Sequence, residues 1–202
     1  DIDGPAKVTG ALPFTCDRAD ADTLYGAFVW SQHSRAKILS MDFSAVESAA
    51  GVVRVLTHKD VPGRNTYATV NPEQPVFCDT EVNFLGDMLA LVVADTEAHA
   101  RAAAKLARVE YEPLPGVFEI EDSYALGGRQ IIRTIDFSSG DLAAAEKKPG
   151  LQTFEGDYYF ERQEHAYIEP ECAIGEYDES TGVVRVTTCT QSPFEIQNML
   201  AP

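Results

Sequence analysis

The sequence is poor in positive charge and lacks the long apolar runs that mark membrane proteins. It has 202 residues, with 16 Lys and Arg against 32 Asp and Glu, for a net charge of −16. A chain with this much negative charge repels phosphate backbones and anionic lipid. Nucleic acids and membrane surfaces are therefore not expected as partners. No apolar run approaches the roughly 20 residues of a membrane-spanning helix. The opening DIDGPAKVTG has neither the basic nor the apolar region of a secretion signal.

Closely spaced cysteine pairs are also missing. Cys16, Cys78, Cys172 and Cys189 are far apart and form no CxxC motif. Zinc sites, iron–sulfur sites and small disulfide frameworks need closer or denser cysteines than these. We therefore expect reduced cysteines in a cytoplasmic protein, several of them buried, and no metal site built from them.

Signatures of nucleotide binding and of common hydrolases do not occur either. There is no G-x-G-x-x-G after a strand, no P-loop, no H-E-x-x-H and no G-x-S-x-G. The many carboxylates could always suggest a glycosidase-like pair, but spacing alone does not support one. With 45% hydrophobic and 24% charged residues, the chain is expected to fold as one domain, or as one domain and part of another.

The first part of the chain alternates strand-like apolar runs with short helical segments. Residues 1–14, rich in Gly and Pro, are expected to form a loop or an edge strand. Ser44 is expected to cap a helix that runs to Ala50 and ends at Gly51. Residues 58–75 form a long loop of the kind that is usually functional or mobile. Strands are expected at residues 24–31, 52–57, 89–94 and 108–112.

A helix is expected directly after the third of these strands. Thr96 is a suitable N-cap for EAHARAAAKLA, whose residues favour helix. Its small side chains suggest that this helix packs closely on a sheet. We expect a charged stripe of Glu97, Arg101, Lys105 and Arg108, and an opposite apolar face of Ala98, Ala102, Ala103 and Leu106.

The segment QEHAYIEPE, residues 163–171, gathers three carboxylates, a histidine and a tyrosine. If it is a strand, His165, Tyr167 and Glu169 share one face, but His165 and Glu169 lie roughly 13 Å apart at about 3.4 Å per residue. That separation excludes a shared metal ion, and Pro170 disfavours a helix. We expect a strand with hydrogen-bonded polar groups, after a polar connector at 119–150 and before a hairpin turn at ESTG.

A second polar motif is TQSPF, residues 190–194. Gln191 comes just past the end of the expected strand VVRVTTC and is followed by Ser-Pro. Chains commonly place binding groups at such strand ends, and an amide can both donate and accept hydrogen bonds. On spacing alone, a capping role within a loop is favoured over a ligand site.

Taken together, these segments resemble the molybdenum-binding chain of the xanthine dehydrogenase and aldehyde oxidase family, the molybdenum hydroxylases. They occur in the family's order, and the combination of VVADT, VEYEPLP, QEHAYIEPE and TQSPF is highly specific. The matching pieces are GPAKVTGALPF followed by Asp17, GAFVWSQHSRAKI, GVVRVLTHKDVPGRN, PVFCDTEVNFLGDMLALVVADTEAHARAAAKLARVEYEPLP, GDYYFERQEHAYIEPECA and TTCTQSPF.

The resemblance implies an α+β fold of two parts. Residues 1–118 resemble an α/β-hammerhead domain, 119–150 a connector, and 151–202 the opening strands of a molybdopterin-binding α+β domain. In the family, the QEH-Y-EP segment is a framework strand of that second domain, which agrees with the geometric argument above.

The resemblance also implies roles for particular residues. Gln191 matches the glutamine that approaches the molybdenum centre and hydrogen-bonds to its oxo ligand, which makes it the candidate catalytic and cofactor-binding residue. Phe194 and Glu195 follow it toward the substrate funnel. Thr69 and Val70, in the loop after P-G-x-N, stand where purine-oxidising members carry a bulky apolar pair, which speaks against xanthine itself as the substrate.

The implied chemistry is hydroxylation of a purine, an N-heterocycle or an aldehyde by water-derived oxygen on molybdenum. The cofactor is molybdopterin, in the plain or the cytosine dinucleotide form, and electrons leave through 2Fe–2S clusters to FAD on partner domains or subunits. The family's G-G-G-F-G-G stretch and its G-x-G-E glutamate base do not occur in these residues, so we expect a fragment that is inactive alone. Two alternatives are a non-catalytic binding module with the hammerhead fold and an unrelated acidic hydrolase.

Overall fold

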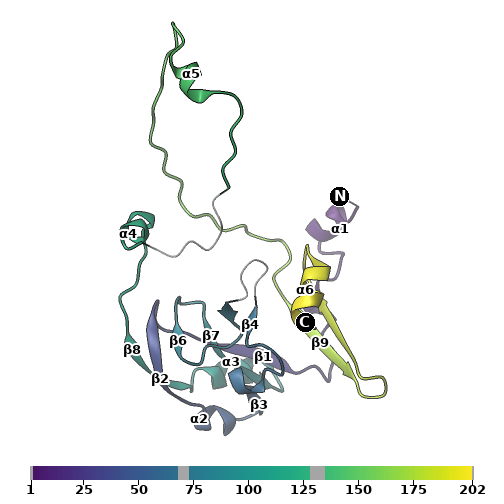
Figure 1. Ribbon diagram of the computed structural model, residues 1–202. Helices are drawn as coiled ribbons and strands as arrows, with labels where there is room; N and C mark the ends of the chain where they lie inside the picture. Colours follow the sequence, from purple (N-terminus) through teal and green to yellow (C-terminus); the bar gives the residue numbers. More distant parts are fainter. Residues whose placement is uncertain (1, 68–72, 128–134, 202) are drawn as a thin grey trace. The chain divides into compact units, whose positions relative to one another are not determined.

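The structure is a computed structural model that describes residues 2–67, 73–127 and 135–201 (Figure 1). Thr69 and Val70 therefore lie outside the described residues. The chain divides into two compact units, which are described separately. The first contains Asp1–Leu12 and Gln130–Pro170, and the second contains Pro13–Arg129 and Glu171–Pro202.

The centre of the second unit is strand β7 (Met88–Ala94), which lies between β1 (Tyr25–Trp30) and β3 (Val52–Leu56). Both neighbours are antiparallel to β7. The β7 sequence MLALVVA is apolar throughout because both faces of this central strand are largely buried. The sequence prediction of these three strands is confirmed.

A second three-stranded sheet has β2 (Ala36–Asp42) at its centre, between β6 (Glu81–Val82) and β8 (Arg108–Pro113). Sequence analysis predicted β8 but not β2, whose apolar residues are interrupted by Lys, Ser and Asp. Cross-strand polar pairs hold this sheet on its exposed face: Lys37 Nζ lies 3.2 Å from Glu112 Oε1 and Ser40 Oγ donates to Glu110 Oε2 at 2.9 Å.

Helix α3 (Glu97–Ala104) packs against β1 and β7, as its small side chains predict. Thr96 Oγ1 accepts a hydrogen bond from the His99 N–H at 3.2 Å, which confirms the predicted N-cap. The Arg101 Nε atom lies 2.7 Å from Glu97 Oε1, as expected for residues one turn apart.

The apolar face predicted for this helix is largely wrong. Ala100 and Ala103 are fully buried, whereas Ala98 and Ala102 are exposed. Residues three apart lie on one face of a helix, so Ala100 and Ala103 pack together against the sheet. Ala98 and Ala102 therefore face solvent. Leu106, also predicted on the buried face, follows the end of the helix and is exposed.

Two expectations for the N-terminal half need correction. Residues 1–14 contain helix α1 (Gly4–Val8) rather than only a loop or an edge strand, since a proline in the first turn is compatible with helix. Helix α2 (Ser44–Glu47) is shorter than predicted, and Ser44 is its first helical residue rather than its N-cap. The carboxylate of Asp42 accepts from the Ser44 N–H at 2.9 Å.

The remaining elements include a hairpin at the predicted ESTG turn, where Asp178 pairs with Val183. The long loop over 58–75 and the connector over 119–150 contain short elements of their own. In chain order, all the remaining elements of the described residues are η1 (Thr15–Arg18), η2 (His58–Asp60), β4 (Thr66–Tyr67), β5 (Gln74–Pro75), α4 (Ile120–Ala125), α5 (Leu142–Glu146), β9 (Ala173–Asp178), β10 (Val183–Thr188) and α6 (Pro193–Leu200).

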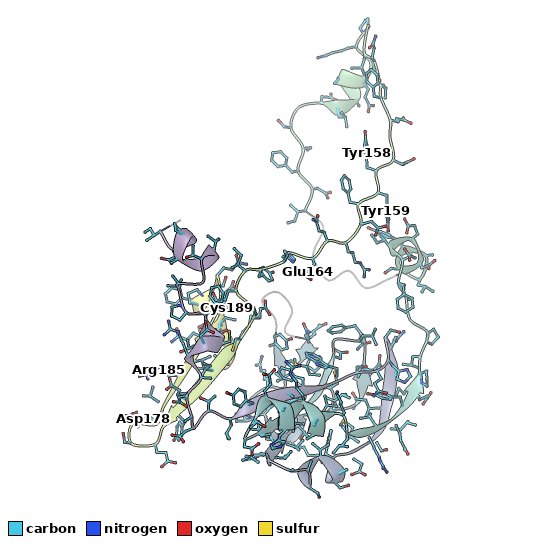
Figure 2. The ribbon with its side chains drawn as sticks, turned by 180° about the vertical axis from the view of Figure 1, so that it is seen from behind. Tyr158, Tyr159, Glu164, Asp178, Arg185 and Cys189 are labelled. Carbon is cyan, nitrogen blue, oxygen red and sulfur yellow. The ribbon has the colours of Figure 1, made fainter. Side chains whose placement is uncertain are left out.

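The strand predicted at 163–171 is not formed. The rings of His165 and Tyr167 stack with centroids 5.3 Å apart, and the intervening Ala166 has a left-handed φ of 53°. Tyr158 and Tyr159, a few residues earlier, lie on an extended segment that is not part of a strand (Figure 2). An extended chain needs a neighbouring strand with a regular ladder of hydrogen bonds to become a strand itself, and no such ladder is formed by residues 163–171.

The main hydrophobic core is built by β7 and the elements packed against it. Its largest fully buried side chains are Leu89, Val46, Val82, Val92 and Cys78. Burial raises the pKa of the Cys78 thiol to about 12, and the nearby Asp87 carboxylate contributes to this rise, since both disfavour a thiolate. Cys78 is buried as predicted, but Cys16 is exposed and Cys172 and Cys189 are half-buried, so the prediction of several buried cysteines is wrong.

Substitution Leu89→Ala is expected to lower the free energy of unfolding by about 2–5 kcal/mol, because it removes apolar contacts from a fully buried site and leaves a cavity. Urea unfolding followed by circular dichroism measures the change. The matched control is Leu39→Ala, at a position in β2 that is 62% exposed, which should change the free energy by less than about 0.5 kcal/mol. Equal losses for the two variants would contradict this description of the core.

Alkylation should separate the cysteines by burial and pKa. At pH 8 a thiol of pKa about 12 is ionised in about one molecule in ten thousand, and thiolate is the reacting form. We expect iodoacetamide to label the exposed Cys16 readily in the folded protein and Cys78 only after unfolding in urea, as read by peptide mass spectrometry. Labelling of Cys78 should also rise with pH well above 8. Rapid labelling of Cys78 in the native protein at pH 8 would show that it is neither buried nor protonated.

Candidate functional site

The described candidate residues Gln191, Phe194 and Glu195 lie in and just after the turn that joins β10 to α6. The end of β10 is fixed by Thr188, whose Oγ1 donates to the Cys172 carbonyl at 2.9 Å. Within the turn, the Ser192 N–H donates to Thr190 Oγ1 at 3.0 Å. Helix α6 then begins at Pro193, whose fixed φ suits the first helical position. These local constraints hold the backbone on both sides of Gln191.

The Gln191 side chain is exposed and makes no hydrogen bond within the described part of the chain. The helix that follows it is preceded by Ser192 as N-cap, and no side chain of the described residues caps it. The capping role favoured on spacing alone is therefore wrong. The amide N–H₂ and C=O of Gln191 are both available to a ligand.

A groove of about 700 Å³ runs between β10 and α6. Its walls are mainly apolar, and Phe194, which is largely exposed, forms part of them. Gln191 and Glu195 are not among its lining residues. Of the three candidate residues that the structure describes, Phe194 lines this groove, whereas Gln191 and Glu195 are its neighbours in the chain but do not line it.

The loop that contains Thr69 and Val70 is described only at its base. There β4 and β5 pair antiparallel, and Asn65 joins the two ends. Asn65 Nδ2 donates to the Phe77 carbonyl at 2.7 Å, and Asn65 Oδ1 accepts from the Phe77 N–H at 3.0 Å. Burial raises the pKa of the neighbouring Tyr67, and the charge of Asp87 adds to this effect.

Sequence analysis did not single out Asn65 as a functional residue. Its only sequence signal is an asparagine that closes a P-G-x-N turn, a residue type that commonly hydrogen-bonds to nearby backbone. Its two bonds to Phe77 span 12 positions and fix where the loop begins and ends. Asn65 therefore has a positioning role for the loop.

The donors of the β10–α6 turn suit a group that accepts hydrogen bonds. They are the Gln191 amide and the first N–H groups of α6, which have no partner within a helix. Within residues 2–67, 73–127 and 135–201, no three His, Cys, Asp or Glu side chains are placed to hold a metal ion. The turn can therefore bind a group that presents oxygen atoms as hydrogen-bond acceptors. In the same ranges, no helix is both long and apolar enough to cross a membrane.

Two family descriptions match the chain. The aldehyde oxidase and xanthine dehydrogenase a/b hammerhead domain matches residues 9–115, which is more than half of the chain. The molybdopterin cofactor-binding domain matches residues 126–202 and so includes the β10–α6 turn. The predicted hammerhead fold, followed by the start of a molybdopterin-binding domain, is thereby confirmed.

Known proteins resemble the chain along most of its length. It is 35% identical over 190 residues to a probable xanthine dehydrogenase subunit of Bacillus subtilis, covering 89% of this chain and 25% of that protein. It is 32% identical to the nicotinate dehydrogenase large molybdopterin subunit of Eubacterium barkeri, covering 99% of this chain and 49% of that subunit. The chain therefore spans between a quarter and a half of these relatives.

The chain also resembles a solved structure over most of its length. The aldehyde oxidoreductase of Desulfovibrio desulfuricans is 32% identical, with a TM-score of 0.77, over 92% of this chain and 23% of that one. The sequence match, the matching architecture and the order of the two domains agree with one another. This chain belongs to the aldehyde oxidase and xanthine dehydrogenase family.

Proposed function

We propose that this chain works as part of a larger molybdenum hydroxylase, which oxidises a purine, an N-heterocycle or an aldehyde with oxygen derived from water. The observation that carries the proposal is the available amide of Gln191, in a turn that belongs to the segment matched by the molybdopterin cofactor-binding domain. The names of the relatives support the substrate range, since they include a nicotinate dehydrogenase and an aldehyde oxidoreductase.

Gln191 is proposed to donate a hydrogen bond to an oxygen of the bound cofactor. When bound, the molybdenum cofactor supplies the oxygen transfer and accepts the two electrons, which no side chain of this chain can do. A neutral amide can orient and polarise such an oxygen without exchanging a proton with it. A donor of this kind, fixed in a site without water, typically contributes about 10²–10³-fold to turnover.

The other candidate residues are proposed to face the substrate. Phe194 offers an exposed aromatic surface beside the β10–α6 groove, which suits a planar ring or an aromatic aldehyde. Glu195 lies one position further along α6, and Thr69 and Val70 complete the proposed funnel from the loop that Asn65 holds. The smaller size of Thr69 and Val70 leads us to favour an N-heterocycle or an aldehyde over xanthine.

The remaining parts of the proposal concern the larger protein. We infer that residues 1–118 form the hammerhead domain, 119–150 the connector and 151–202 the beginning of the cofactor domain, and that this piece is inactive alone. Partner domains or subunits with 2Fe–2S clusters and FAD would carry the electrons away. The cofactor would be molybdopterin, in its plain or cytosine dinucleotide form. The wide spacing of the four cysteines, which is unlike a disulfide framework, leads us to favour the cytoplasm as the place of action.

The test is Gln191→Ala in the full-length protein purified with its partners. Turnover is measured with an aromatic aldehyde, an N-heterocycle and a purine, using a dye as electron acceptor. We expect kcat to fall about 100-fold for the substrate that the native protein oxidises, with the molybdenum and pterin contents unchanged. Gln191→Glu should not restore activity, because a carboxylate cannot donate.

The matched control is Gln152→Ala, at an exposed glutamine of the other unit, which should leave kcat unchanged. Retention of kcat within about twofold by Gln191→Ala would contradict the proposed hydrogen bond. A native holoprotein that oxidises none of the three substrate classes would contradict the proposed function itself.

A further inference from the structure

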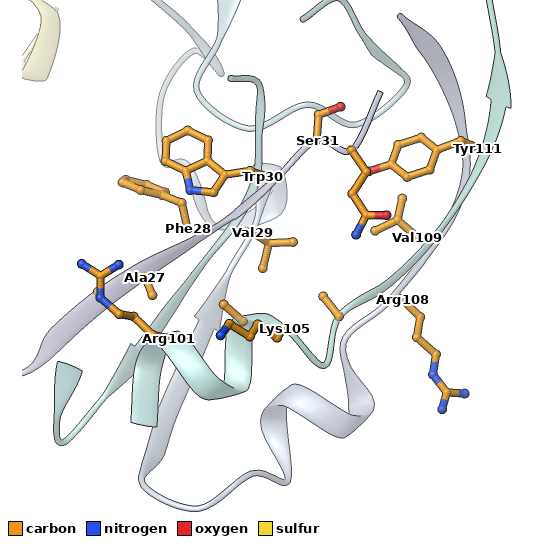
Figure 3. A pocket seen from close by; sticks show the side chains of 14 residues that line it. Ala27, Phe28, Val29, Trp30, Ser31, Arg101, Lys105, Arg108, Val109 and Tyr111 are labelled. Carbon is orange, nitrogen blue, oxygen red and sulfur yellow. The ribbon is translucent and has the colours of Figure 1, made fainter. Parts of the chain in front are cut away.

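The two sheets of the second unit each present an outer strand to the same groove. Strand β1 is the outer strand of the order β1-β7-β3, and β8 is the outer strand of the order β6-β2-β8. The groove has a volume of about 810 Å³ and is lined by residues 26–32 in and just after β1, by β8, and by the end of α3 (Figure 3). Within the described residues neither strand has a neighbour on this side, so each offers backbone N–H and C=O groups that no other strand pairs.

Strand β1 has one feature that can protect an outer strand, a shift in its register with β7 between Val29 and Trp30, but it lacks others. Its sequence YGAFVW contains no charged residue and no proline, which are the residues that commonly block further pairing. Phe28 and Trp30 are 39% and 49% exposed, and their rings lie 5.1 Å apart between centroids. An exposed edge with two adjacent aromatic side chains is suited to an added strand that carries apolar residues on one face.

The charge of the groove is opposite to that of the chain. Its lining includes Arg101, Lys105 and Arg108 but no Asp or Glu, although the chain has twice as many acidic as basic residues. Arg101 is paired with Glu97. Arg108 lies near Asp42, a carboxyl whose pKa is lowered mainly by hydrogen bonds from Ser44 and further by the charge of this arginine. Lys105, at the C-terminal end of α3, has no ion-pair partner in the part of the chain that the structure describes.

These features fit a polypeptide better than a small anion. The groove is lined along β1, and Val29, Ala104 and Ala107 add apolar side chains to its lining. The cationic side chains come from the end of α3 and the start of β8 (Figure 3). A small anion would use the charges but leave the strand edge and the aromatic rings uncovered. An extended peptide can pair with the edge, bury alternate apolar side chains and direct carboxylates toward the cations.

We propose that this groove binds an extended, acidic segment of a partner polypeptide, which adds as a further strand to the free edge of β1. The inference rests on the free edge, the exposed aromatic pair and the local positive charge. It does not depend on the chemistry proposed for Gln191, because no groove-lining residue belongs to the β10–α6 turn.

The probe is a fluorescein-labelled ten-residue peptide of alternating Glu and Val, titrated with the intact protein and read by fluorescence anisotropy. The same peptide with Lys in place of Glu should bind at least about tenfold more weakly, because it brings positive charge next to Lys105, which has no ion-pair partner among the described residues. Lys105→Glu should weaken binding of the Glu-Val peptide about tenfold. The matched control is Lys147→Glu, since Lys147 also follows the end of a helix, α5, and is not among the groove residues.

Backbone pairing is tested separately with two N-methylated versions of the Glu-Val peptide, one for each set of alternate amides. Only one edge of an added strand faces β1, so one version should lose binding and the other should retain it. The proposal is overturned if the Glu-Val peptide does not bind, if Lys105→Glu binds it like the native protein, or if both methylated versions bind equally. Formation of dimers that exclude the peptide, seen by light scattering, would assign the edge to a second copy instead and also overturn it.

Discussion

Strand β7 is enclosed on both edges and on both faces, and the placement of the other elements of the second unit depends on it. Leu89, Ala90, Val92 and Ala94 are fully buried, with β1 and β3 paired on either side and α3 packed over the sheet. The backbone of its first residue also holds a loop, because the Cys78 N–H donates to the Met88 carbonyl at 2.7 Å. The hydrophobic effect thus fixes the strand, and the strand fixes the polar segments around it.

One of those segments leads to the proposed substrate loop. Cys78 is held by β7, the adjacent Phe77 is hydrogen-bonded to Asn65, and Asn65 stands immediately before β4. The base of the loop is therefore tied to the core over a path of three residues. A loop that is anchored in this way can vary in sequence without disturbing the fold.

The sequence was informative where the structure is determined locally or by strong burial. The apolar run of β7 and the Thr96 cap of α3 could be recognised because each signal lies within a few consecutive residues. The predicted strand at 163–171 was wrong because pairing depends on a neighbour distant in sequence, which composition cannot supply. The buried face of α3 was misassigned because an alanine-rich helix offers little contrast between its faces.

The same distinction applies to the candidate site. Gln191 was singled out as a candidate because it follows a strand end and matches a family motif, and the structure leaves its amide available. Asn65 was missed because its role consists of two contacts made 12 positions away, and an isolated loop asparagine carries no periodic signal. A motif in the sequence can indicate a candidate ligand-binding residue. A residue that positions a loop is recognised only from its contacts in the structure.

The electrostatics of the β1 groove follow from the difference between local and distant charge. At physiological ionic strength the screening length is about 8 Å, so a peptide carboxylate within the groove responds mainly to nearby charges. Arg101 is already paired with Glu97 and Arg108 lies near Asp42, so Lys105 contributes most of the attraction. The net charge of −16 acts on a whole approaching copy of the chain, which carries the same excess of acid. Repulsion between copies opposes pairing of one β1 edge with another, while the local cations still favour an acidic strand. The chain can therefore keep an unprotected edge for a partner of opposite local charge and limit its own association.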